Sequence, residues 1–128
     1  MKACFLDTCA VIHNLGGSRA ITDILEDYDD VLISHVVVGE LIFGCNRSAD
    51  PPRERARLDG WLLSVSVVAG TSVTARFYGE LASDLEVRGI RIPQNDLWIA
   101  ALCIQSNLPL VSSDRHFSRP RGLQWVCY

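Results

Sequence analysis

The chain has 128 residues, a length that suits one domain, and we predict a single domain over residues 1–128. Hydrophobic residues make up 48% and charged residues 21%, which argues against a disordered chain, a coiled coil and a collagen-like repeat. The formal net charge of −3 provides no global positive field, so a nucleic acid would have to be bound by a local site.

The hydrophobic pattern predicts strands and helices that alternate along the chain. In chain order we expect a strand over 3–6, helices over 8–15 and 18–27, a strand over 31–34, helices over 36–46 and 52–63, a strand over 65–68, helices over 72–88 and 95–106, and strands over 108–112 and 123–126. Apolar strands that alternate with helices favour an α/β fold, a three-layer α/β/α sandwich with a central parallel sheet. Ligands of such sheets bind beyond the carboxyl ends of the strands.

The five cysteines are an odd number without CxxC spacing, which argues against a disulfide framework and against a zinc site. Most of them lie in apolar runs, so we expect small buried side chains in a reducing compartment. The first residues lack a basic leader, and no segment approaches about 20 uninterrupted apolar residues. We therefore expect a cytoplasmic protein without a membrane segment.

Four carboxylates stand at positions that suit a ligand site. Asp7 directly follows the first predicted strand and Asp114 lies just past the fourth, so both fall beyond carboxyl ends of strands. Glu40 lies within an apolar helix, where a buried carboxylate needs a partner. Asp96 opens the most apolar helix of the chain. The alternatives are helix capping or turn formation for the three aspartates, and an ion pair with Arg47 for Glu40.

Convergence of these carboxylates would require a counter-charge. Two like charges about 4 Å apart repel by about 4 kcal/mol at an effective dielectric constant of about 20. A cluster of four acids is therefore stable only with protonation or with a bound cation. Carboxylate oxygens select Mg²⁺ or Mn²⁺, and such ions can activate a water and stabilise the leaving oxygen of a phosphodiester.

The four acids lie in segments 6–8, 39–44, 92–101 and 112–117, which read LDT, GELIFG, IPQNDLWIAA and SSDRHF. Through these segments the sequence resembles a PIN domain, and more closely the VapC-like ribonuclease toxins of bacterial type II toxin–antitoxin pairs. The resemblance spans nearly the whole chain. It implies the family's parallel α/β/α sandwich and a metal-dependent endonuclease that cleaves RNA, commonly tRNA or rRNA.

The resemblance also implies a role for each acid and for its neighbours. Asp7, Asp96 and Asp114 would bind Mg²⁺ or Mn²⁺, and Glu40 would bind metal or position the attacking water, which makes these four the catalytic residues. Their expected supporting residues are Thr8, Asn95 and Ser112. The hydroxyls of Thr8 and Ser112 would lie near the acids, and Asn95 would cap its helix and help to orient Asp96. Family members usually form homodimers and are silenced by a cognate antitoxin that occupies the acidic groove.

Other residues near the fourth acidic segment have more than one interpretation. Arg115, Arg119 and Arg121 could bind RNA phosphates or could form local ion pairs on a solvated loop. His116 could be a loop histidine, a phosphate contact or a general acid. Trp98 could pack in the core or could offer a platform on which a base stacks.

Two other functions compete with the ribonuclease. A non-cleaving PIN-like module that binds RNA or protein would not need the complete set of acids. A receiver or phosphatase-like domain would use Asp7 as a nucleophile, but the DxD signature of that chemistry is absent, since Thr8 and Cys9 follow it. The complete acidic set therefore favours the enzyme.

Overall fold

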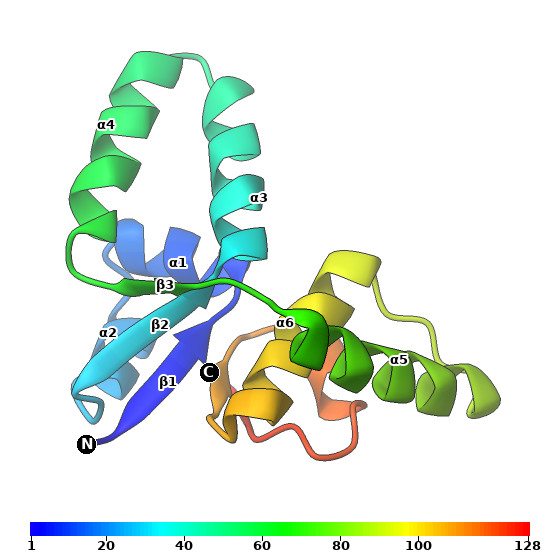
Figure 1. The fold of residues 1–128 in the computed structure, drawn as a ribbon. Helices are drawn as coiled ribbons and strands as arrows, with labels where there is room; N and C mark the ends of the chain where they lie inside the picture. The colour runs from blue at the N-terminus through cyan, green and yellow to red at the C-terminus, as the bar shows by residue number, and fades with distance from the viewer.

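The computed structural model describes residues 1–128 and contains one parallel sheet of five strands, in the order β3-β2-β1-β4-β5 (Figure 1). The strands are β1 (Ala3–Leu6), β2 (Asp30–Ser34), β3 (Ser66–Val68), β4 (Leu110–Val111) and β5 (Trp125–Val126). The helices are α1 (Thr8–Leu15), α2 (Arg19–Leu25), α3 (His35–Asn46), α4 (Pro51–Leu62), α5 (Ser72–Val87) and α6 (Gln94–Ser106), followed by one 3₁₀ turn, η1 (Arg115–Ser118). The predicted α/β class is confirmed.

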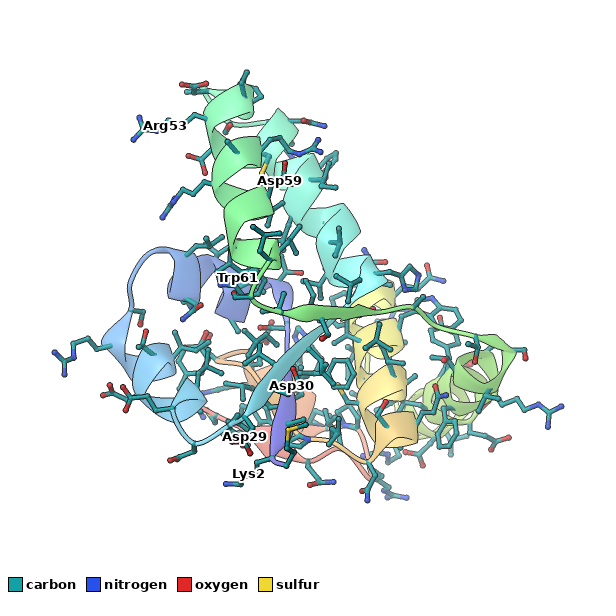
Figure 2. All side chains as sticks on the ribbon, turned by 60° about the vertical axis from the view of Figure 1, so that its left-hand side comes forward. Lys2, Asp29, Asp30, Arg53, Asp59 and Trp61 are labelled. Atoms are coloured by element: carbon teal, nitrogen blue, oxygen red, sulfur yellow. The ribbon has the colours of Figure 1, made fainter.

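The central strand β1 is buried on both faces, which explains its apolar sequence. Cys4, Phe5 and Leu6 are at most 1% exposed, and β1 pairs with β2 on one side and with β4 on the other. Helices α1 and α2 lie on one face of the sheet, and α5 and α6 lie on the other (Figures 1 and 2). Helix α6 is the most buried helix, as its apolar sequence predicts.

Helices α3 and α4 form a hairpin that projects beyond the carboxyl ends of the strands (Figure 1). Arg53 lies toward its tip and Trp61 at its base, whereas Lys2 lies at the opposite end of the sheet (Figure 2). The Trp61 indole donates to the Asn14 side chain (2.8 Å), and Arg57 donates to the carbonyl of Leu15 (2.5 Å). The base of the hairpin is therefore anchored on α1, next to the sheet edge where a ligand is expected.

The last two strands are shorter than predicted. The apolar run over 108–112 yields only Leu110–Val111, because Pro109 has no N–H to donate, although its carbonyl still accepts from Phe5 (2.8 Å). The run over 123–126 yields Trp125–Val126. The 3₁₀ turn η1 was not predicted, and it brings the segment after Asp114 back toward the sheet.

All five cysteines are free, in agreement with the absence of a disulfide framework. Cys4 and Cys103 are buried, and burial raises the pKa of the Cys4 thiol to about 12. Cys9 and Cys127 are exposed, so the prediction of buried cysteines is wrong for these two. None of the helices combines the length and the apolar character that a membrane crossing requires.

Candidate active site

The four acids of the sequence motifs lie in one region at the carboxyl end of the sheet. Asp7 follows β1, Asp114 follows β4, and α3 and α6 carry the other two acids, Glu40 and Asp96. Burial raises the pKa of the Cys9 thiol, and the charges of all four carboxylates raise it further. Because the charges of all four carboxylates act on the same thiol, the four acids lie in one region of the molecule.

Asp7 is the most deeply placed of these acids, with 4% of its surface exposed. It caps helix α1 by accepting a hydrogen bond from the Ala10 N–H (2.9 Å), and it accepts a second from the Ser112 hydroxyl (2.7 Å). Burial raises the pKa of Asp7, the two hydrogen bonds oppose that rise, and the charge of Asp114 adds to it. Asp7 therefore caps helix α1, and its carboxylate also lies close to the charge of Asp114.

Ser112 couples two of the acids to each other. It is fully buried at the end of β4, and its oxygen accepts the Asp114 backbone N–H (3.0 Å) while its hydroxyl donates to Asp7. This hydroxyl therefore fixes the acid that follows β1 against the segment that follows β4. The pairing of β1 with β4 brings together residues that are 105 positions apart.

Glu40 is held by a hydroxyl rather than by a cation. The Thr8 hydroxyl donates to Glu40 Oε1 over 2.7 Å, which joins the start of α1 to the middle of α3. Arg47 forms no ion pair with Glu40, and its guanidinium lies 5.4 Å from the centre of the Phe43 ring. The proposed Glu40–Arg47 ion pair is therefore wrong, because Arg47 follows the exposed end of the helix.

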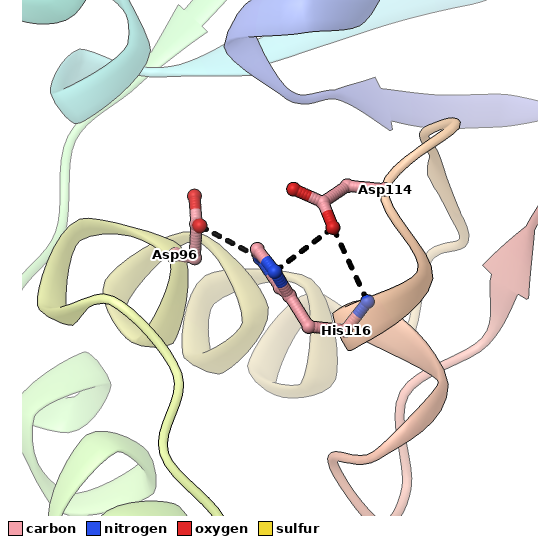
Figure 3. A group of neighbouring side chains, drawn as sticks. All are labelled: Asp96, Asp114 and His116. Carbon is pink, nitrogen blue, oxygen red and sulfur yellow. Dashed lines mark hydrogen bonds and ion pairs between the residues drawn. The ribbon is translucent and has the colours of Figure 1, made fainter.

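Asp96, Asp114 and His116 form the most compact group of the site (Figure 3). His116 Nε2 lies 2.7 Å from Asp96 Oδ2, and its Nδ1 lies 2.8 Å from Asp114 Oδ1. Asp114 also caps η1 by accepting the His116 backbone N–H (3.2 Å). Burial raises the pKa of Asp96; His116 opposes that rise, and the charges of Glu40 and Asp114 add to it.

His116 lies between two of the acids. Its Nε2 forms a hydrogen bond with Asp96, and its Nδ1 lies beside the Asp114 carboxylate. A neutral imidazole has one N–H, so it donates to one of the two carboxylates at a time. The ring thus lies at the place where a cation bound by these acids would act.

Asn95 does not cap its helix. Helix α6 begins at Gln94 with Pro93 in the capping position, and Asn95 is an exposed residue inside the first turn. The prediction that Asn95 is the cap is wrong, because the fixed backbone of Pro93 already starts the helix one residue earlier.

The three arginines past Asp114 do not act as one group. Arg121 lies 3.3 Å from Asp84 of α5, in agreement with a local ion pair, and Arg88 binds the same carboxylate and the carbonyl of Arg119. Arg115 and Arg119 are exposed and form no ion pair. These two remain available to a phosphate.

Sequence reasoning missed two features of the site. It placed His116 near Asp114 from their spacing but did not place it against Asp96, because that contact depends on the unpredicted turn η1. It also missed Tyr128, whose hydroxyl lies 2.6 Å from His13 Nδ1 and whose pKa is raised by burial and then by the charges of Asp7 and Cys9. No feature of the local sequence could indicate this contact, because His13 and Tyr128 are 115 positions apart.

The residues present fit a divalent cation. Ligand atoms of Asp96, Asp114 and His116 lie within 4.8 Å of one another, and Asp7 is joined to the same group through Ser112. No lysine or arginine forms an ion pair with any of the four acids. A donor set dominated by carboxylate oxygens, with no arginine or lysine counter-charge, suits a hard divalent cation.

Comparison with known proteins agrees with this site. The family model of the PIN domain matches residues 4–123. The chain is 30% identical over 129 residues to Ribonuclease VapC2 of Haemophilus influenzae, covering 94% of this chain and 96% of that protein. It is 29% identical over 93 residues to a protein of Shigella flexneri named tRNA(fMet)-specific endonuclease VapC, covering 72% of this chain and 70% of that protein.

A solved structure gives the same answer for the fold. The structure of VapBC2 from Rickettsia felis bound to a promoter DNA fragment superposes with a TM-score of 0.91 at 25% identity, covering 98% of each chain. The chain belongs to the PIN domain family, among the VapC ribonucleases. The resemblance carried by the four acidic segments is confirmed.

The raised pKa of Asp96 predicts that this acid lowers stability in the absence of metal. The folded chain holds the Asp96 proton more tightly than the unfolded chain, so its stabilising effect is complete below the ordinary aspartate pKa of about 3.9. That effect is lost as pH rises through the raised pKa. In a chelator at pH 7, Asp96→Asn should therefore melt at a higher temperature than the parent chain.

Thermal unfolding followed across the acidic range checks this prediction. The difference between Asp96→Asn and the parent should shrink toward zero as pH falls to the ordinary aspartate range. Asp23→Asn, a change of an exposed acid on α2, is the matched control and should show no such trend. If Asp96→Asn is less stable than the parent at pH 7, the claim that the charge of Asp96 destabilises the folded chain is wrong.

Proposed function

We propose that the chain is a metal-dependent endoribonuclease and the toxin of a toxin–antitoxin pair. The observation that carries this proposal is the convergence of four carboxylates in one region with no arginine or lysine paired to them. Asp7, Asp96 and Asp114 would hold Mg²⁺ or Mn²⁺. A bound cation of this kind lowers the pKa of water and stabilises developing charge on the leaving oxygen of a phosphodiester.

The residues of the chain have separable tasks in this reaction. Ser112 fixes the Asp7 carboxylate relative to the backbone of Asp114, so that the two acids stay close to each other. Thr8 occupies one oxygen of Glu40 and leaves the other free to orient water and accept its proton. His116 holds Asp96 and Asp114 together and offsets part of their charge. Arg115 and Arg119 can contact RNA phosphates beside the acids.

The relatives support the choice of substrate and partner. We infer RNA as the substrate, with tRNA favoured by the name of the Shigella relative, and an antitoxin as the protein partner. We also infer a homodimer. Large apolar side chains are exposed along the edge strand β3 and the helices beside it: Phe43 (62%), Leu63 (90%), Val67 (50%), Val73 (49%) and Phe77 (37%). A second copy covering them would remove this apolar surface from water.

Mapping of RNA ends tests the proposed activity. The chain is induced in a bacterial host, and new 5′ ends are compared between the parent, Asp96→Asn and the control Asp23→Asn. Asp96→Asn conserves shape but removes a ligand charge, so we expect the parent and the control to create ends at one or a few sites and Asp96→Asn to create none. Equal cutting by soluble Asp96→Asn, or no new ends with the parent, would count against the proposal.

The Thr8 hydroxyl should affect the rate rather than RNA binding. Thr8→Val keeps the shape of the side chain and removes the donor to Glu40, so kcat should fall by about 10–100-fold with little change in KM. Thr8→Ser keeps the donor and should retain most of the activity. Steady-state cleavage of the mapped RNA measures both constants, and an unchanged kcat in Thr8→Val would remove Thr8 from the mechanism.

A further inference from the structure

A hollow of about 400 Å³ lies beside the acidic cluster and has no part in the chemistry described above. Its lining residues come from the start of α3, the loop before α5 and the first two turns of α6. Its walls, which we call the Trp98 pocket, are His35, Val36, Gly70, Thr71, Asn95 and Trp98. The pocket lies close to the site along both helices, because Asn95 directly precedes Asp96 on α6 and Val36 lies one turn before Glu40 on α3.

The indole of Trp98 differs from the other two indoles of the chain. Trp61 donates its N–H to Asn14 (2.8 Å), and Trp125 donates to the carbonyl of Ser112 (2.9 Å). The N–H of Trp98 has no partner within the chain. Tyr78 stacks on Trp98 with ring centres 3.9 Å apart and planes 16° apart, so the half-buried ring is fixed while its donor stays free.

The polar groups of the pocket are also oriented by the fold and left with a free donor. His35 Nδ1 accepts the Gly70 N–H (3.2 Å), so the neutral ring carries its proton on Nε2 and can donate from there. The oxygen of Thr71 accepts the Val73 N–H (3.2 Å), which leaves its hydroxyl proton free. The exposed amide of Asn95 offers both donors and an acceptor.

The pocket contains no carboxylate, lysine or arginine, in contrast to the four acids beside it. A neutral aromatic wall with several donors and an amide fits a nucleobase, which stacks on aromatic rings and forms hydrogen bonds through its edges. It does not fit a phosphate, which would be met by arginine or lysine. We propose that the Trp98 pocket binds a nucleobase of the RNA next to the phosphodiester that is cut. The inference rests on the proposed function for the identity of the RNA.

The three indole N–H signals in a ¹⁵N–¹H correlation spectrum test the pocket without any cleavage. The parent chain is titrated with AMP, GMP, CMP and UMP, and Trp98→Phe identifies the Trp98 signal by its loss. We expect the Trp98 signal to move saturably with at least one nucleotide. The signals of Trp61 and Trp125, whose N–H groups are engaged, should stay in place. Asn95→Ala should weaken the apparent affinity several-fold.

Three results would overturn the proposal. The chemical shift of the Trp98 N–H could stay unchanged with all four nucleotides at millimolar concentration. It could move equally with ribose 5-phosphate, which has no base and would indicate a phosphate site. It could follow the concentration of the protein rather than that of the nucleotide, which would assign this surface to contact between copies of the chain.

Cleavage of a random-sequence RNA pool separates the pocket from the activity itself. Sequencing of the product ends should reveal a base preference at one position beside the cut for the parent and for Val87→Ala, a control at an 89% exposed position. In Trp98→Leu and Asn95→Ala, the remaining cleavage products should show a weaker base preference at that position. If both pocket variants keep the base preference of the parent, the proposal of nucleobase binding is wrong and the proposed function stands. If the parent cuts no RNA, the proposed function is contradicted, and the nucleotide titration alone tests whether the pocket binds a nucleobase.

Discussion

Repulsion between clustered carboxylates is the constraint on which the rest of this structure depends. The fold places Asp7 and Asp114 after neighbouring strands and brings Asp96 and Glu40 to them from α6 and α3. Burial and mutual repulsion raise the pKa of both Asp7 and Asp96. No arginine or lysine pairs with these charges, and His116 is the one basic side chain that contacts them, between Asp96 and Asp114. A bound divalent cation would offset the same repulsion more completely and would supply the reactivity of the proposed function.

The sheet makes this arrangement rigid. Strand β1 lies in the centre of the sheet with both faces covered, and the acid that follows it is tied to β4 through a single buried hydroxyl, that of Ser112. The first turn of α1 supplies the Thr8 hydroxyl that holds Glu40. Each acid thus sits on a regular element or at its end, where neighbouring hydrogen bonds fix it. Preorganisation of this kind removes the cost of gathering charges during the reaction.

The sequence was sufficient to predict the order of the helices and strands, because the hydrophobic period is a local signal. It also placed Asp7 and Asp114 just after strands, where the structure has them. It failed where the answer depends on three-dimensional pairing. The bridge from His116 to Asp96 needs the turn η1, and the approach of Tyr128 to His13 joins the two ends of the chain. The cap at Asn95 was wrong because Pro93 starts the helix, and Arg121 turned toward Asp84 because α5 passes beside it. The sequence also could not indicate that Tyr78 of α5 stacks on Trp98 of α6, because this contact depends on the packing of two helices.

Calorimetric titration with Mn²⁺ tests the central claim most directly, since it asks whether the acids share a cation. The parent chain should bind Mn²⁺ at neutral pH, and the affinity should fall as the pH is lowered, because protonated carboxyl groups bind metal poorly. Asp96→Asn and Asp114→Asn should each bind at least about tenfold more weakly, whereas Asp23→Asn should bind as the parent does. Equal affinity in all four proteins, or no binding by the parent, would contradict the account.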